Sequence, residues 1–107
     1  MAAMNLNTEQ FYNMMEEGKT ILLDFWAPWC VYCRRISAAY DKLAEQYGDK
    51  LVIAKINIDD EPLAANREQI QVIPTLVLYQ GGEAIANIVA PESKAKIEEF
   101  LRDNLDL

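Results

Sequence analysis

The first half of the chain alternates between helical and strand-like hydrophobic patterns. Asn7 or Thr8 can cap a first helix that ends near Glu17, because either side chain can accept a hydrogen bond from the first helical turn. The run 21–26 is apolar except for Asp24. A short run of this kind predicts a strand that is covered on both faces of its sheet.

A longer helix is predicted over residues 31–47. Apolar residues recur there at steps of three and four, which places them on one face of a helix: Cys33, Ile36, Tyr40, Leu43 and Tyr47. The run 51–58 is rich in β-branched residues and predicts a second strand. A helix between two such strands is the usual right-handed crossover of a parallel βαβ unit.

The second half predicts a hairpin between two helices. Pro62 suits the start of a short helix that ends near Gln69. The apolar run 75–79, a Gly-Gly turn and the run 83–89 predict two antiparallel strands. Ser93 can cap a last helix whose inward-facing residues are Ile97, Phe100, Leu101 and Leu105. The predicted order is αβαβαββα, a single α/β domain over residues 1–107.

Composition narrows the possible partners. The chain has 107 residues, with 51% hydrophobic and 25% charged residues, which suits one soluble domain. Ten basic and seventeen acidic residues give a net charge of −7, which disfavours nucleic acid and anionic membranes because both repel an acidic surface. The N-terminus lacks the basic and apolar regions of a secretory signal, and no apolar run approaches the length of a membrane span. We therefore expect a cytoplasmic protein.

The chain contains no histidine and only two cysteines, Cys30 and Cys33. The lack of histidine excludes Ser-His-Asp triads, Cys-His dyads and Cys/His zinc sites. Two cysteines are too few for a structural zinc, so no metal site is predicted. A lone C-x-x-C pair points mainly to redox chemistry.

Four separate segments resemble the thioredoxin family, in the family's order. They are the stretch Trp26-Ala-Pro-Trp29-Cys30-Val31-Tyr32-Cys33, preceded by Asp24-Phe-Trp; Lys55-Ile-Asn-Ile-Asp59; Ile73-Pro74-Thr75; and Gly82-Glu83. The resemblance covers nearly the whole chain. It implies a thioredoxin fold, with a central mixed β-sheet of one βαβ and one ββα unit flanked by helices on both faces.

The chemistry of disulfide exchange assigns different roles to the two cysteines. A thiolate must attack the substrate disulfide, and a second thiol must resolve the mixed disulfide. Cys30 is predicted at a helix N-terminus, where free N–H groups favour the thiolate, and is the expected attacking residue. Cys33 lies one turn further along, on the apolar face, and is the expected resolving residue. The redox-active disulfide then needs no bound cofactor.

Asp24 and Lys55 are the expected proton-handling residues. Burial of a carboxylate in an apolar strand raises its pKa, and the family resemblance places Asp24 beneath the cysteines as a proton relay to the buried thiol. The resemblance also implies that Lys55 approaches Asp24 from the neighbouring strand. Alternative interpretations are an Asp on the open face of an edge strand and a Lys that faces solvent.

An apolar docking surface for protein substrates is expected around the cysteines. The family resemblance implies that Pro74 is cis and faces the disulfide, and proline leaves the backbone of Ile73 free to pair with an extended chain. The residues expected to contact substrate are Trp29, Val31, Tyr32, Ile73, Pro74, Val89 and Ala90.

The sequence departs from the family pattern mainly between the cysteines. Val31 and Tyr32 stand where typical thioredoxins have Gly-Pro, and oxidoreductases of this fold with different intervening residues span on the order of 150 mV. Tyr32 restores an N–H that proline lacks, which is expected to stabilise the Cys30 thiolate and make the potential less reducing. Pro28, Ala38 and Ala90 also differ: Ala38 replaces a helix-kinking proline, and Ala90 replaces a glycine at the rim of the docking surface.

These observations predict a thiol–disulfide oxidoreductase that reduces protein disulfides. The resemblance implies thioredoxin reductase as electron donor, and we expect a monomer. Four alternatives remain open: a more oxidising disulfide oxidant or isomerase, a glutaredoxin-like activity, a non-catalytic binding module regulated by its thiols, and an iron–sulfur cluster shared between two chains.

Overall fold

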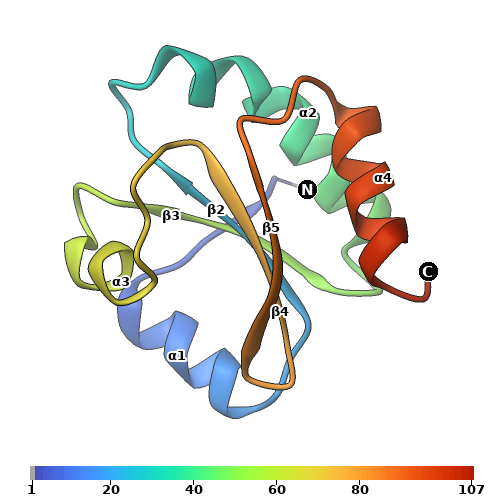
Figure 1. The fold of residues 1–107 in the computed structure, drawn as a ribbon, viewed down its shortest axis with the longest axis horizontal. Helices are drawn as coiled ribbons and strands as arrows, with labels where there is room; N and C mark the ends of the chain where they lie inside the picture. Colours follow the sequence, from blue (N-terminus) through green and yellow to red (C-terminus); the bar gives the residue numbers. More distant parts are fainter. Residues whose placement is uncertain (1) are drawn as a thin grey trace.

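A computed structural model describes residues 2–107 as a mixed β-sheet with helices on both faces (Figure 1). The elements are β1 (Met4–Asn5), α1 (Thr8–Glu16), β2 (Ile21–Trp26), α2 (Val31–Tyr47), β3 (Val52–Asn57), α3 (Pro62–Arg67), β4 (Thr75–Gln80), β5 (Glu83–Val89) and α4 (Lys94–Asn104). Every predicted helix and strand is present, and their bounds differ from the predicted ones by at most about two residues.

The sheet has the strand order β1-β3-β2-β4-β5. Strand β3 is parallel to both β1 and β2, whereas β4 pairs antiparallel with β2 and β5. The βαβ and hairpin predictions are therefore confirmed. The prediction lacked β1, an exposed edge strand of two residues that pairs with Ala54 and Lys55. Two residues are too few to show the alternating pattern that identifies a strand.

The two faces of the sheet carry separate parts of the hydrophobic core, because successive strand residues point to opposite faces. Leu22 packs with buried residues of α2 and α4, such as Ile36 and Ile97. Leu23, its neighbour in β2, packs with Phe11 of α1 and Ala64 of α3. Figure 1 shows α2 and α4 on one side of the sheet and α1 and α3 on the other.

Capping side chains set the helix starts that the sequence predicted. The side chain of Asn7 accepts the Gln10 N–H while Gln10 reaches back to the Asn7 N–H, which forms a capping box. Ser93 accepts the Lys96 N–H at the start of α4. Cys30 is itself the N-cap of α2, so the cysteine pair lies where β2 has ended and α2 begins. Among residues 2–107, no helix combines the length and the apolar composition that crossing a membrane requires.

Candidate active site

Cys30 and Cys33 form a disulfide at the first turn of α2, with their Cα atoms 5.2 Å apart. The N–H of Cys33 donates to Sγ of Cys30 at 3.1 Å. Cys30 is 8% exposed and Cys33 is 3% exposed, so the predicted order of burial is confirmed, although both are largely covered. The sequence analysis expects the N–H of Tyr32 to stabilise the Cys30 thiolate, which belongs to the reduced form. In this oxidised form, the N–H that donates to Cys30 belongs to Cys33.

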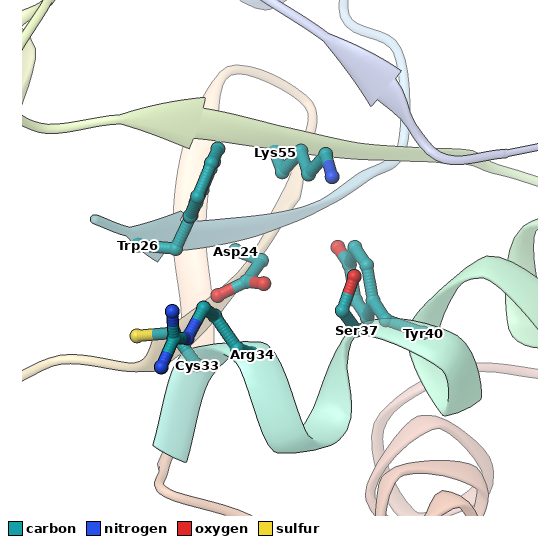
Figure 2. Close-up of a pocket in the computed structure, with 7 residues that line it drawn as sticks. All are labelled: Asp24, Trp26, Cys33, Arg34, Ser37, Tyr40 and Lys55. Carbon is teal, nitrogen blue, oxygen red and sulfur yellow. The ribbon is translucent and has the colours of Figure 1, made fainter. Parts of the chain in front are cut away.

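Asp24 lies in the middle of β2, buried on one side of the sheet. Its Oδ1 atom is buried and has no hydrogen-bond partner among the described residues. Burial raises the pKa of Asp24 to about 7, and the nearby charge of Lys55 opposes that rise. Figure 2 shows the carboxylate pointing from β2 towards α2, the helix that carries Cys33. The expectation of a covered strand, rather than an open edge, is confirmed for β2.

Asp24 and Cys33 line one pocket of about 230 Å³. Lys55 also lines this pocket and pairs with Asp24 in the register of the parallel strands β2 and β3. Its ammonium lies 5.0 Å from the ring centroid of Trp26, a cation–π geometry. The remaining lining residues, which the sequence analysis did not single out, are Trp26, Arg34, Ser37 and Tyr40. The pocket therefore joins the buried carboxyl to the expected resolving cysteine.

The loop that precedes β4, which contains Ile73 and Pro74, also faces the disulfide. The Ile73–Pro74 peptide bond is cis, as the resemblance implies, and Pro74 is buried. The carbonyl oxygen of Ile73 lies 4.0 Å from Sγ of Cys30. Among the described residues, neither the N–H nor the C=O of Ile73 has a backbone partner. Both groups are therefore available to pair with an extended chain.

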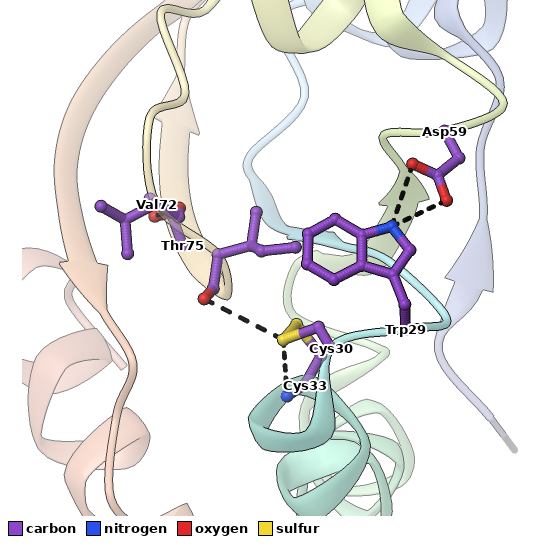
Figure 3. Close-up of a disulfide and its surroundings, with 7 residues drawn as sticks. Trp29, Cys30, Cys33, Asp59, Val72 and Thr75 are labelled. Carbon is purple, nitrogen blue, oxygen red and sulfur yellow. Dashed lines mark hydrogen bonds between the residues drawn. A yellow bond between two sulfur atoms is a disulfide. The ribbon is translucent and has the colours of Figure 1, made fainter.

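Exposed apolar side chains surround the disulfide. Trp29 is 65% exposed, and its indole N–H donates to the carboxylate of Asp59 at 3.0 and 3.3 Å (Figure 3). Val31 and Val89 are also exposed. The structure adds Val72, which is 54% exposed and whose carbonyl accepts the Thr75 hydroxyl. The sequence analysis did not mark Val72, and it placed Asp59 in a family-like segment without predicting its contact with Trp29, because both roles depend on contacts between separate loops.

Tyr32 and Ala90 meet beside the disulfide. The hydroxyl of Tyr32 lies 3.3 Å from the carbonyl oxygen of Ala90 and 3.1 Å from that of Pro91, and both carbonyls can accept its hydrogen. Ala90 has a φ of 46°, in the left-handed region that favours glycine. Of the seven residues expected to contact substrate, Tyr32 and Ile73 pack against the two cysteines, and Trp29 and Val31 adjoin Cys30 in the chain. Ala90 is joined to Tyr32 and to Pro74 by hydrogen bonds, and Val89 directly precedes it.

The arrangement can perform two-electron thiol–disulfide exchange without a further group. Among residues 2–107, no group of three or more Cys, Asp or Glu side chains is placed to hold a metal ion. The reduced pair supplies one thiol at the N-terminus of α2 and a second in its first turn, and exchange requires one attacking and one resolving thiol.

Comparison with known proteins agrees with this chemistry. The family model described as Thioredoxin matches residues 2–103. A thioredoxin of Alicyclobacillus acidocaldarius subsp. acidocaldarius is 35% identical over 104 residues, which cover 97% of this chain and 99% of that protein. A thioredoxin of Acidithiobacillus ferridurans is 38% identical over 93 residues, covering 87% of this chain and 86% of that protein.

One further relative combines two activities in its name. It is a bifunctional thioredoxin reductase/thioredoxin of Mycobacterium leprae, 33% identical over 93 residues that cover 87% of this chain and 20% of that protein. The match over nearly the full chain, together with the expected fold and the disulfide at a helix start, leads to one conclusion. This chain belongs to the thioredoxin family and is a thioredoxin-type thiol–disulfide oxidoreductase, whose redox-active group is the Cys30–Cys33 disulfide.

Proposed function

We propose that this protein reduces protein disulfides, with Cys30 attacking and Cys33 resolving. The Cys30 thiolate attacks one substrate sulfur, forms a mixed disulfide and releases the other substrate sulfur as a thiolate, which takes up a proton. The Cys33 thiolate then attacks Sγ of Cys30 and releases the second substrate thiol. The substrate disulfide gains two electrons and two protons, and the Cys30–Cys33 pair becomes the disulfide. The observation that carries this assignment is the position of Cys30 as the N-cap of α2.

Asp24 is the proposed proton acceptor for Cys33 during resolution. The two residues line one pocket, and a carboxyl with a pKa of about 7 is near the value at which a group exchanges protons at neutral pH. In the reverse reaction, the same group returns the proton to Cys33. Lys55 supports this role by its positive charge, which favours the ionised form of Asp24 and opposes the effect of burial.

The substrate is proposed to bind across the exposed residues beside the disulfide. Ile73 offers unpaired backbone groups next to Sγ of Cys30, and Trp29, Val31 and Val89 offer exposed apolar side chains. A backbone pairing of this kind orients an extended chain independently of its sequence, while the apolar side chains select among substrates. The binding surface is supported by three residues that are joined by hydrogen bonds: Pro74, Tyr32 and Ala90.

The proposed electron donor is thioredoxin reductase. The printed name of the Mycobacterium leprae relative joins a thioredoxin reductase to a thioredoxin, which supports this partnership. We also propose that the protein acts in the cytoplasm as a monomer. Relatives from bacteria support the cytoplasmic location. A complete cysteine pair within one chain supports the monomer.

A coupled assay tests the proposal. Purified protein, NADPH and a bacterial thioredoxin reductase are mixed with insulin, and NADPH oxidation is followed with the precipitation of the reduced insulin chains. We expect turnover that Cys30→Ser abolishes, whereas Cys33→Ser traps a mixed disulfide that a thiol reductant releases. Failure of the dithiol form to reduce insulin would contradict reduction of protein disulfides. Insulin reduction with dithiothreitol but not with the reductase would contradict only the donor.

The residues between the cysteines suggest a less reducing potential than that of a Gly-Pro motif. We propose that Val31 and Tyr32 stabilise the thiolate, and hence the reduced form, because Tyr32 has the N–H that proline lacks. Equilibration with glutathione is expected to give a less negative potential for this protein than for its Val31→Gly, Tyr32→Pro variant. An equal or more negative value would refute the assignment.

A further inference from the structure

We propose that Tyr32 is a positioning residue, whose hydroxyl ties the loop after β5 to the first turn of α2 and thereby fixes the docking surface for protein disulfides. This inference rests on the proposed reduction of protein disulfides. It assigns to the Tyr32 side chain a role separate from that of its backbone N–H.

The contacts of the side chain support a structural tie. The Tyr32 hydroxyl is within hydrogen-bond distance of the carbonyls of Ala90 and Pro91, at 3.3 and 3.1 Å. Its ring packs against the main core cluster and against the cluster around the cysteines. Because the ring packs against both clusters, its hydroxyl has a fixed position next to the loop after β5.

The loop after β5 is also held by a second contact, with the Ile73-Pro74 segment that faces the disulfide. The N–H of Ala90 donates to the carbonyl of Pro74 at 2.8 Å. The preceding residue, Ile73, has its carbonyl oxygen 4.0 Å from Sγ of Cys30. The contacts therefore form a closed ring that runs from Cys30 through Tyr32, Ala90 and Pro74 to Ile73 and back to Cys30.

The backbone conformation of Ala90 supports the idea that this ring holds the loop. A φ of 46° lies in the left-handed region, where a Cβ atom crowds the following carbonyl oxygen, so it is unfavourable for alanine. Such a conformation persists only where the surroundings determine it. Here the N–H and the C=O of Ala90 are both engaged, by Pro74 and by Tyr32 respectively.

The hydrogen bond between Tyr32 and Ala90 affects substrate binding through Val89. Val89 is exposed, ends β5 and directly precedes Ala90, so the tie to Ala90 sets its distance from the disulfide. In the proposed binding mode, a protein substrate contacts Val89, Ile73 and Cys30 together. Without the hydroxyl, the loop that carries Val89 becomes more mobile. Substrate binding must then order this loop, and the entropic cost weakens binding. The cost falls on binding, whereas the sulfur exchange at Cys30 keeps its geometry.

The test compares Tyr32→Phe with a matched control, Tyr47→Phe. Phenylalanine keeps the packed ring and removes only the hydroxyl. Tyr47 lies at the far end of α2, where its hydroxyl donates to Glu98 of α4. Each protein is reduced, freed of reductant and mixed with excess insulin in a stopped-flow instrument. The rate as a function of insulin concentration gives a half-saturating concentration and a limiting rate. Hydrogen exchange at the Ala90 N–H is measured by NMR on the oxidised proteins.

For Tyr32→Phe, we expect the half-saturating concentration to rise threefold or more, the limiting rate to change less than twofold, and exchange at Ala90 to accelerate tenfold or more. Tyr47→Phe is expected to match the wild type in all three. The inference is wrong if Tyr32→Phe leaves the half-saturating concentration or the Ala90 exchange within twofold of the wild type. It is also wrong if the limiting rate falls as much as binding weakens. Failure of the wild type to reduce insulin would instead refute the proposed function, since the exchange measurement does not depend on insulin.

Discussion

Replacing Asp24 by Asn should change how the stability of the protein depends on pH. In the folded state, burial raises the pKa of Asp24 from its ordinary value of 3.8 to about 7. At about 1.4 kcal/mol for each pKa unit, this difference corresponds to roughly 4 kcal/mol between the low-pH and high-pH limits. Because the raised pKa means that folding favours the protonated carboxyl, the stabilisation is fully present below about pH 4 and is lost as the pH rises through about 7.

The size of the effect can be measured between pH 5 and pH 8. Over that range, the Asp24 contribution to the free energy of unfolding should fall by roughly 2–3 kcal/mol, because part of it is already lost at pH 5. Asp24→Asn cannot ionise, so the variant should lack this decrease and be more stable than the wild type at pH 8. Asp49→Asn, at an exposed position, controls for the loss of one negative charge.

Urea unfolding of the oxidised proteins, followed by tryptophan fluorescence at several pH values, supplies the free energies. The oxidised form is used because the pKa of Asp24 refers to the disulfide state. The m-values must agree between variants for the midpoints to report stability alone. If Asp24→Asn and the wild type lose the same stability between pH 5 and pH 8, the burial argument is refuted. A decrease that Asp49→Asn removes equally well would refute it too.

Three further substitutions test other parts of the structure. Ala90→Gly should raise the unfolding free energy by about 0.5–1 kcal/mol in urea titrations, because glycine adopts a positive φ at little steric cost. Tyr40→Phe should lower it by about 1 kcal/mol, since the buried hydroxyl bonds carbonyls of both β2 and β3. Glu68→Gln should lower the thermal midpoint, because Tyr12 and Tyr79 both donate to Glu68. In spectrophotometric titration it should also lower the Tyr12 pKa from about 12, because burial, the largest cause of the rise, remains while the Glu68 charge is lost.

Local patterns were sufficient to locate the redox chemistry. The helical spacing from Cys33 to Tyr47, the run around Asp24 and the resemblance at Ile73-Pro74 predicted helix α2, strand β2 and the segment that faces the disulfide. The helix and the strand are visible in sequence because burial imposes a period on neighbouring residues, whereas the segment that faces the disulfide was predicted only from the family resemblance. The N-cap position of Cys30 is also local, since it depends on where one helix starts.

Short elements and contacts between distant residues were not predictable in this way. Strand β1 has only two residues and exists through its pairing with β3. The hydrogen bond from Trp29 to Asp59 joins residues that are thirty positions apart, and the bond from Tyr32 to Ala90 joins residues fifty-eight apart. Neither partner shows a pattern that identifies the other. The Cys33 N–H that donates to Sγ of Cys30 in the oxidised form was not predicted either, because it depends on how the first turn of α2 is oriented towards Cys30.

The amino-acid sequence alone predicts one redox pair at a helix start, without histidine, on an α/β domain. These properties follow from residue identity and local periodicity. The tertiary structure decided the environment of that pair: the pocket that joins Asp24 to Cys33, and the ring of contacts that runs through Tyr32 and Ala90. The physical reason is that burial, pKa and loop position depend on which elements pack together, and packing is a property of the whole fold.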